Sequence, residues 1–141
     1  MLVTFPKDFL WGGATSGPQT EGRFKKKHDS VFDYDFDHYQ ERFWGALGPD
    51  TASNFFHDFK EDIRLMKEAG LKSLRTSIQW TRLIDDFEKN TVNEQGLAFY
   101  NAVIDECLAQ GIRPMLNLNH FDLPMELMER YGGCLLYTSP S

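Results

Sequence analysis

Residues 112–118 read IRPMLNL, an apolar run that continues into NHFDLP at residues 119–124. The run has the length and composition of a buried strand, and it lies between Gly111, which suits the end of a helix, and Pro124, which suits the start of another. The order helix, strand, helix is typical of α/β proteins, whose parallel strands are joined by right-handed crossovers. A strand that served only the core would end in a simple turn. The imidazole, aromatic and carboxylate groups that follow this strand therefore indicate a binding edge.

The rest of the chain repeats this pattern. Further strands are predicted at residues 9–14 and 71–80, and helices at residues 51–69, 93–110 and 125–131, where apolar residues recur every three or four positions. The apolar stripe of the first helix consists of Ala52, Phe56, Phe59, Ile63 and Met66. The expected caps and stops are Asp50 or Thr51 with Gly70 for the first helix, and Asn93 with Gly111 for the second. The predicted order is β, long loop, α, β, loop, α, β, α.

Composition and charge exclude several classes of protein. With 41% hydrophobic and 26% charged residues, the chain is typical of a soluble globular protein. Its net charge of −6 argues against nucleic acid or an anionic membrane as a partner, and the basic run RFKKKH at residues 23–28 is predicted to be a solvated loop. Two cysteines without a CxxC pair, and no signal-peptide pattern at the N-terminus, indicate the reducing cytoplasm.

Metal and nucleotide sites are poorly supported by the sequence. The run DYDFD at residues 33–37 resembles the first ligands of a calcium loop, but His38 and Trp44 stand where glycine and glutamate are needed. The four histidines have no metal-type spacing, and WGGATSG at residues 11–17 matches neither dinucleotide-binding nor phosphate-binding glycine motifs. No metal and no organic cofactor are predicted.

Polar side chains follow each predicted strand, at the edge where α/β proteins bind ligands. They include Gln19 after the first strand, Trp80 and Arg82 after the second, and His120 after the third. Amides, an imidazole and aromatic rings suit a polyhydroxylated ligand such as a sugar. From the residues alone, Glu21 and Asp122 form a candidate pair of carboxylates for glycosidic cleavage.

Three motifs in register resemble glycoside hydrolase family 1. They are FPKDFLWGGATSGPQTEG at residues 5–22, LRTSIQWTRL at 74–83 and NHFDLP at 119–124. The residues of these motifs, with Phe121 where many members have tryptophan, most resemble those of the bacterial 6-phospho-β-glucosidases.

The resemblance implies a TIM (β/α)8 barrel, of which about the first three βα units would be present. Such a barrel needs about 250 residues. Residues 1–133 are expected to be the N-terminal part of one glycosidase domain, and residues 134–141, CLLYTSPS, a non-native read-through tail. The implied activity is retaining hydrolysis of 6-phospho-β-glucosides. A 6-phospho-β-galactosidase, an unphosphorylated β-glucosidase and a non-catalytic sugar-binding or interaction domain remain as alternatives.

Four residues take site roles through this resemblance. Gln19, His120 and Phe121 match substrate-binding positions, and Arg75 matches the arginine that keeps the nucleophile ionised. Glu21 and Asp122 match positions that are not catalytic in the family, against the pairing suggested above. The family's two catalytic glutamates lie in Asn-Glu-Pro and Thr/Ser-Glu-Asn-Gly motifs, and neither motif occurs here. The chain alone is therefore expected to be inactive.

Overall fold

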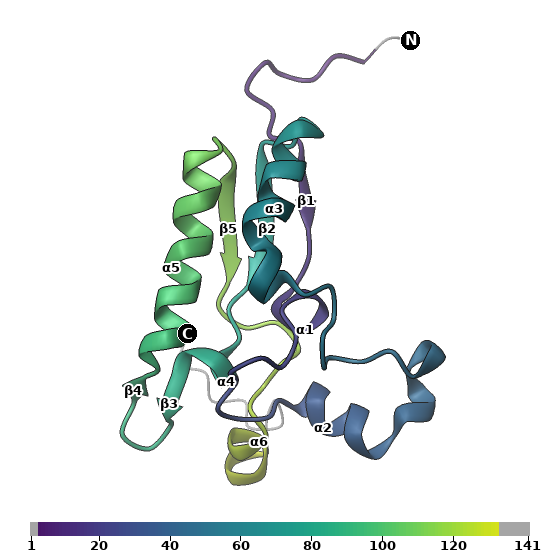
Figure 1. Cartoon of the computed structure of the whole chain (residues 1–141), viewed down its shortest axis with the longest axis vertical. Coiled ribbons are helices and arrows are strands. Elements are labelled where there is room, and N and C mark those ends of the chain that lie inside the picture. The colour runs from purple at the N-terminus through teal and green to yellow at the C-terminus, as the bar shows by residue number, and fades with distance from the viewer. Residues whose placement is uncertain (1–2, 133–141) are drawn as a thin grey trace.

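The computed structural model of the chain describes residues 3–132, and its centre is a parallel sheet (Figure 1). The strands β1 (Gly12–Ala14), β2 (Ser73–Ser77) and β5 (Arg113–Asn117) lie in the order β1-β2-β5. All pairs are parallel, and Leu74 lies between Gly13 and Pro114 in the register. The three predicted strands are thus confirmed, although each is shorter than the sequence suggested.

Two long helices, α3 (Phe55–Glu68) and α5 (Glu94–Ala109), lie side by side over one face of this sheet (Figure 1). Asn93 caps α5 as predicted, because its side chain accepts a hydrogen bond from the backbone N–H of Gly96. The buried hydrophobic core lies between helices and sheet and consists of Phe55, Ile63, Leu74, Phe99, Tyr100, Val103, Cys107 and Ile112.

Helix α3 begins four residues later than the sequence predicted. Ala52 and Asn54 have φ angles of 52° and 61°, so the chain turns in the left-handed region before the helix begins at Phe55. A helical pattern of apolar residues cannot reveal such a turn. As a result, Phe55 replaces Ala52 as the core residue of the first turn.

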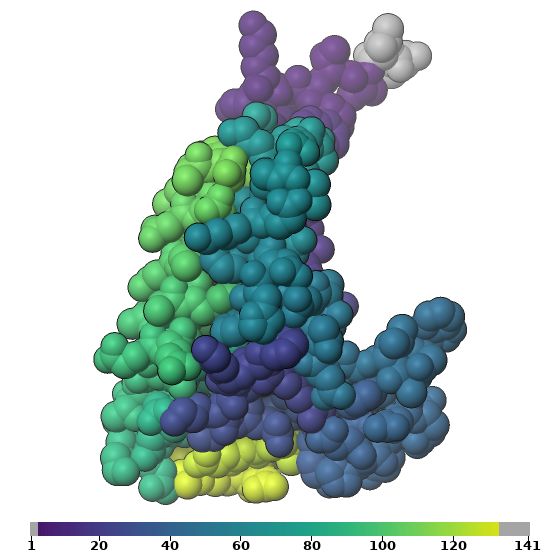
Figure 2. All heavy atoms as spheres, in the orientation of Figure 1, coloured from purple at the N-terminus to yellow at the C-terminus, as the bar shows by residue number. Residues whose placement is uncertain are grey.

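The segment between β1 and α3, predicted as a long loop, contains several short helices. These are α1 (Gly17–Thr20), α2 (Val31–His38) and the 3-10 helices η1 (Gln40–Arg42) and η2 (Trp44–Ala46). Helix α2 begins with a capping box at Ser30, a signal that sequence reasoning missed. Figure 2 shows α2, η1 and η2 as a lobe that projects from the side of the molecule.

Strand β2 also ends earlier than predicted, because Trp80 begins a short helix, α4 (Trp80–Leu83). A two-stranded antiparallel hairpin, β3 (Ile84–Asp86) with β4 (Thr91–Val92), follows and leads into α5. The sequence predicted only a loop here, since strands of two or three residues carry no usable period.

The segments that follow the three parallel strands gather at one end of the molecule (Figure 1). Helix α6 (Met125–Tyr131) lies there, and Pro124 is its N-cap rather than its first residue. An isolated bridge joins Pro124 to Ser30, so the segment after β5 is tied to the start of α2. This end of the sheet is where the predicted site residues should meet.

The sheet face opposite α3 and α5 carries Ala14, Arg75 and Met115, which are partners in the register. Met115 is 43% exposed, so no described segment covers this face fully. None of the helices within residues 3–132 is long and apolar enough to cross a membrane. The predicted tail at residues 134–141 lies outside the described residues.

Candidate functional site

Arg75 joins the ends of all three parallel strands. It lies on β2, and its guanidinium donates to the carbonyl oxygen of Thr15, after β1, and to Oδ1 of Asn117, at the end of β5, both at 3.3 Å. The same group lies 3.4 Å from Nδ1 of His120. A guanidinium has only donors, so Nδ1 must accept and the ring proton lies on Nε2. His120 therefore keeps an N–H free to donate to a ligand.

Aromatic rings lie next to this pair. The ring of Phe121 lies 4.6 Å from the His120 ring and 5.4 Å from that of Phe32, and Phe121 is 41% exposed. The indole N–H of Trp80 donates to the carbonyl oxygen of Leu118. Phe32 comes from α2, a helix that sequence reasoning did not predict, so it could not be assigned to the site. Together the rings provide apolar surface beside polar groups.

Gln19 lies on α1, the helical turn that follows β1. Its side chain is exposed, and its Oε1 accepts a hydrogen bond from Oγ of Ser16 at 2.7 Å. An open groove of about 650 Å³ runs beside it, lined also by Phe32, Phe36 and Leu47. Arg75 and His120 are not among the residues that line this groove. Gln19 thus lies at the same end of the sheet as the Arg75–His120 pair, on the side of α2.

Glu21 is not available as a catalytic group. It is 2% exposed, and its Oε2 accepts from Nε of Arg82 and from Nε2 of Gln79, both at 2.8 Å. The hydroxyl of Tyr100 donates to the same carboxylate at 3.1 Å. Burial raises the pKa of the Glu21 carboxyl, against the opposing effect of Arg82. Arg82, expected from the sequence to line a ligand site, is instead buried and forms an ion pair with Glu21.

Asp122 is also buried, with 3% of its surface exposed. Its Oδ1 accepts from the backbone N–H of His120 at 3.4 Å, and burial raises its pKa. The pairing of Glu21 with Asp122 as two catalytic carboxylates was therefore wrong. Both carboxylates are buried, and Glu21 already accepts hydrogen bonds from three side chains.

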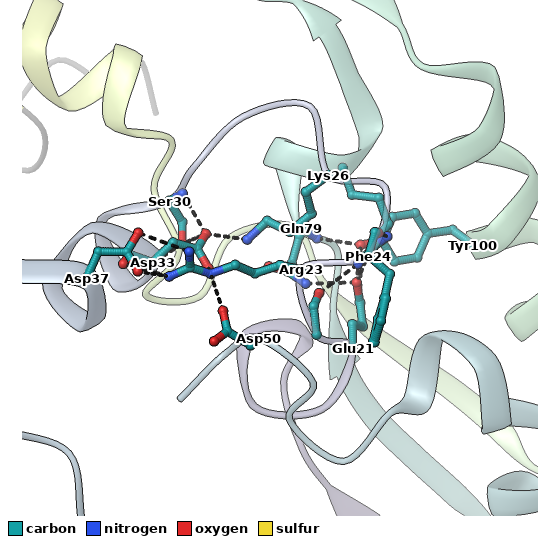
Figure 3. A network of polar contacts seen from close by, with 12 residues as sticks. Glu21, Arg23, Phe24, Lys26, Ser30, Asp33, Asp37, Asp50, Gln79 and Tyr100 are labelled. Carbon is teal, nitrogen blue, oxygen red and sulfur yellow. Dashed lines mark hydrogen bonds and ion pairs between the residues drawn. The ribbon is translucent and has the colours of Figure 1, made fainter. Parts of the chain in front are cut away.

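The basic run at residues 23–28 is a solvated loop only in part: Lys25 and Lys27 are exposed, but carboxylates hold Arg23 and Lys26 (Figure 3). Arg23 contacts both Asp33 and Asp37, and Lys26 forms an ion pair with Asp33 in which both side chains are almost fully buried. Asp33 also accepts two hydrogen bonds from Ser30. These ion pairs fix the loop between α1 and α2 beside the aromatic rings. Among the described residues, no three His, Cys, Asp or Glu side chains could together hold a metal ion.

Comparison with known proteins gives consistent matches along the chain. A family model described as "Glycosyl hydrolase family 1" matches residues 1–137. The chain is 47% identical over 131 residues to the 6-phospho-beta-glucosidase GmuD of Bacillus subtilis (strain 168), and 41% identical over 147 residues to the 6-phospho-beta-glucosidase AscB of Escherichia coli (strain K12). These matches cover 92% and 94% of this chain but only 28% and 31% of the relatives.

A solved structure supports the same likeness. The rice Os3BGlu6 beta-glucosidase superposes with a TM-score of 0.82 at 35% sequence identity. The superposition covers 92% of this chain and 27% of the rice protein. The sheet, its two long helices and the short helices at the carboxyl ends thus recur together in a protein about three times as long.

Proposed function

Because the chain belongs to glycosyl hydrolase family 1, we propose that it is part of a retaining β-glycoside hydrolase that acts on 6-phospho-β-glucosides. Strands β1, β2 and β5 with their helices are a partial (β/α)8 barrel, the fold that the sequence resemblance implied. The chain spans 28–31% of the length of its two curated relatives. The proposed activity is therefore that of a longer protein, in which this chain supplies one part of the barrel.

The contact between Arg75 and His120 is the observation that carries this proposal. It leaves a fixed N–H donor, Nε2 of His120, at the carboxyl end of the sheet, where sugar hydroxyls need paired donors and acceptors. Gln19 adds an amide that can both donate and accept, and Phe121 adds an exposed ring for the C–H face of a sugar. These groups form one wall of the proposed sugar site.

In the proposed reaction, one glutamate attacks the anomeric carbon and a second protonates the leaving oxygen, with about 5 Å between the two carboxyl groups. This sequence contains neither glutamate motif of the family, so the longer protein would supply both groups. Arg75 would lie beside the nucleophile, where a cation favours the ionised carboxylate. The 141-residue chain alone should then hydrolyse no β-glycoside.

The relatives support a phosphorylated substrate first. GmuD, at 47% identity, and AscB, at 41%, are 6-phospho-beta-glucosidases, while the beta-glucosidase 10 of Arabidopsis thaliana is 46% identical. The rice likeness favours an unphosphorylated β-glucosidase as the runner-up. A 6-phospho-β-galactosidase is a third candidate. A phosphorylated substrate would also favour a cytoplasmic location, since such sugars arise on import by a phosphotransferase system.

A chimera tests the proposal directly. Residues 3–132 of this chain would replace the matched segment of GmuD, and hydrolysis of p-nitrophenyl β-glucoside 6-phosphate would be measured. We expect an active enzyme, which would show that this chain supplies a working part of the site; the choice among phosphorylated, unphosphorylated and galacto substrates is tested by comparing their rates with the longer native protein. A folded chimera that binds sugars without hydrolysing them would support the non-catalytic alternative. The 141-residue chain, assayed in parallel, should be inactive.

Two substitutions in the chimera test the proposed sugar contacts. Gln19→Ala and His120→Ala should each lower kcat/KM by about 100-fold, because each removes a hydrogen bond that strengthens in the transition state. Gln95→Ala is the matched control, since Gln95 is exposed at the start of α5. Equal rates for all three variants would contradict the assignment of Gln19 and His120.

A further inference from the structure

Arg82 is a buried centre that holds the chain following α1. It is 1% exposed, and its Nε donates to Glu21 while its NH2 group donates to the carbonyl oxygen of Gly22 at 2.9 Å. Its NH1 group donates to the carbonyl oxygen of Phe24. The rings of Phe56 and Phe99 lie 4.3 and 5.4 Å from the guanidinium carbon. One side chain from α4 thus binds three of the four residues 21–24.

The N-terminal end of α1 is also attached to the region around the end of β2. The backbone N–H of Gly17 donates to Oγ of Ser77, the last residue of β2, at 2.9 Å. A Cβ on Gly17 would lie 2.5 Å from Cγ of Gln79, so only glycine allows this close approach. Gln79 is one of the residues that donate to Glu21, as Figure 3 shows. The start and the end of α1 therefore both contact residues 77–82, at the end of β2 and just after it.

Gln19 lies between these two attachment points and, within residues 3–132, its side chain makes no hydrogen bond outside its own turn. Its described side-chain bond is to Ser16, within the same turn. Its position must therefore be set by the residues that fix both ends of α1.

A buried ion pair stabilises a fold little, since the cost of removing two charges from water offsets their attraction. The pair of Glu21 with Arg82 could be replaced by apolar residues of similar size if it served stability alone. It instead joins three separate elements: α1 through Glu21, α4 through Arg82 and α5 through Tyr100, whose hydroxyl donates to Glu21 and accepts from the N–H of Gln79. These contacts fix the position of α1 relative to α4 and α5.

We propose that Glu21 is a positioning residue: its contacts with Arg82, Gln79 and Tyr100 hold α1 against the end of β2 and thereby place Gln19 at the sugar site. The proposal rests on the proposed function, because the role of Gln19 in sugar binding is part of it. Glu21 itself touches no substrate.

Amide hydrogen exchange of the full chain, followed by NMR, tests the proposal. Glu21→Gln keeps the shape of the side chain and removes its charge. We expect exchange protection at the amides of Gly17 and Gln19 to fall by about 10-fold or more, while Val103 and Cys107 in the core of α5 lose about 2-fold at most. Asp37→Asn, which removes an exposed ion pair to Arg23, should leave the amides of α1 unchanged.

Two further variants keep the test decisive if Glu21→Gln folds poorly. Tyr100→Phe preserves the ion pair and removes one donor to Glu21, so it should loosen α1 by about 3-fold, the effect of one lost hydrogen bond. Ser77→Ala removes the contact at Gly17 and should loosen α1 without disturbing the ion pair.

Equal loss of protection in α1 and in the core would reduce Glu21 to a stabilising residue and overturn the proposal. So would unchanged protection of α1 in both Glu21→Gln and Tyr100→Phe. Because the exchange experiment uses the chain without sugar, its outcome is separate from the activity of the chimera, which decides the proposed function.

Discussion

The guanidinium of Arg75 on β2 lies 3.4 Å from Nδ1 of His120, beyond the end of β5. Arginine cannot accept a hydrogen bond, so this contact selects one tautomer of the histidine. The neighbouring strand thereby fixes which ring nitrogen of His120 can donate to a ligand. Two residues that are 45 positions apart in sequence thus determine together where the site offers a hydrogen-bond donor.

The tautomer of His120 can be measured directly. At about pH 8.5, where imidazoles are neutral, ¹⁵N NMR should show His120 with an unprotonated Nδ1. In Arg75→Met the two tautomers should exchange, because nothing then donates to Nδ1. His38 is the internal control: its Nδ1 lies 2.8 Å from the carbonyl oxygen of Tyr34, so that nitrogen must carry the proton. A protonated Nδ1 on His120 in the unsubstituted chain would contradict the inference.

Asp33 should make the chain sensitive to acid. Its burial is outweighed by Lys26 and Ser30, which lower its pKa below the ordinary value of 3.8. A lowered pKa contributes stability above pH 3.8, and that contribution is lost as pH falls through the folded-state pKa. Asp33→Asn should therefore reduce the free energy of unfolding by about 2–3 kcal/mol at neutral pH, and by much less in acid.

Urea unfolding at a series of pH values checks this difference. Asp35→Asn is the matched control, because Asp35 lies on the same helix and pairs with Arg42 at the surface. It should change the free energy of unfolding by about 0.5 kcal/mol or less. A constant gap between Asp33→Asn and the unsubstituted chain down to the acid limit would argue against the lowered pKa.

Arg82→Met should show the opposite dependence on pH. Glu21, whose pKa burial already raises above its ordinary value of 4.5, would lose its counter-charge. A raised pKa means that stability is greatest below pH 4.5 and is lost as pH rises through the folded-state pKa. The variant should lose about 3–5 kcal/mol at neutral pH and less in acid.

Thermal or urea unfolding of three proteins tests this expectation. Arg82→Met with Glu21→Gln should recover part of the loss, because no uncompensated charge is then buried. Arg64→Met, which removes an exposed pair with Glu61, should have little effect at any pH. If Arg82→Met were equally unstable in acid and at neutral pH, the ionised Glu21 would not be the cause.

Met115 should respond differently in the chain and in the chimera. It lies on the sheet face away from α3 and α5 and is 43% exposed in the chain. In a complete barrel this face becomes the packed interior. Met115→Lys should therefore cost about 0.5 kcal/mol or less in the chain, and about 3 kcal/mol or more in the chimera.

Circular dichroism melting of both proteins measures this contrast. Leu108→Lys is the control, since Leu108 is exposed on α5 and should tolerate lysine in both settings. A large loss for Met115→Lys in the chain itself would mean that this face is already covered.

The sequence predicted the repeated elements well because their signals are local. The apolar period of α5, its cap Asn93 and its stop Gly111 lie within or next to the helix, and the structure confirms them. The start of α3 was misplaced because the left-handed conformation of Asn54 leaves no trace in an apolar period. The short elements α1, η1 and η2 were missed for a similar reason, since a single turn carries too few residues to show periodicity, whereas the capping box at Ser30 could have revealed the eight-residue helix α2.

The sequence by itself determined the alternation of helices and strands and the end of the sheet where polar residues collect, because hydrophobic period, caps and motifs depend on near neighbours. Only the tertiary structure decided which polar residues are available there. Glu21 and Arg82, 61 positions apart, satisfy each other in the interior, whereas Arg75 and His120 stay partly open at the rim. Contacts between distant segments determine which side chains are buried and paired. For that reason, equally polar residues can be enclosed in the interior or exposed to a ligand in this fold.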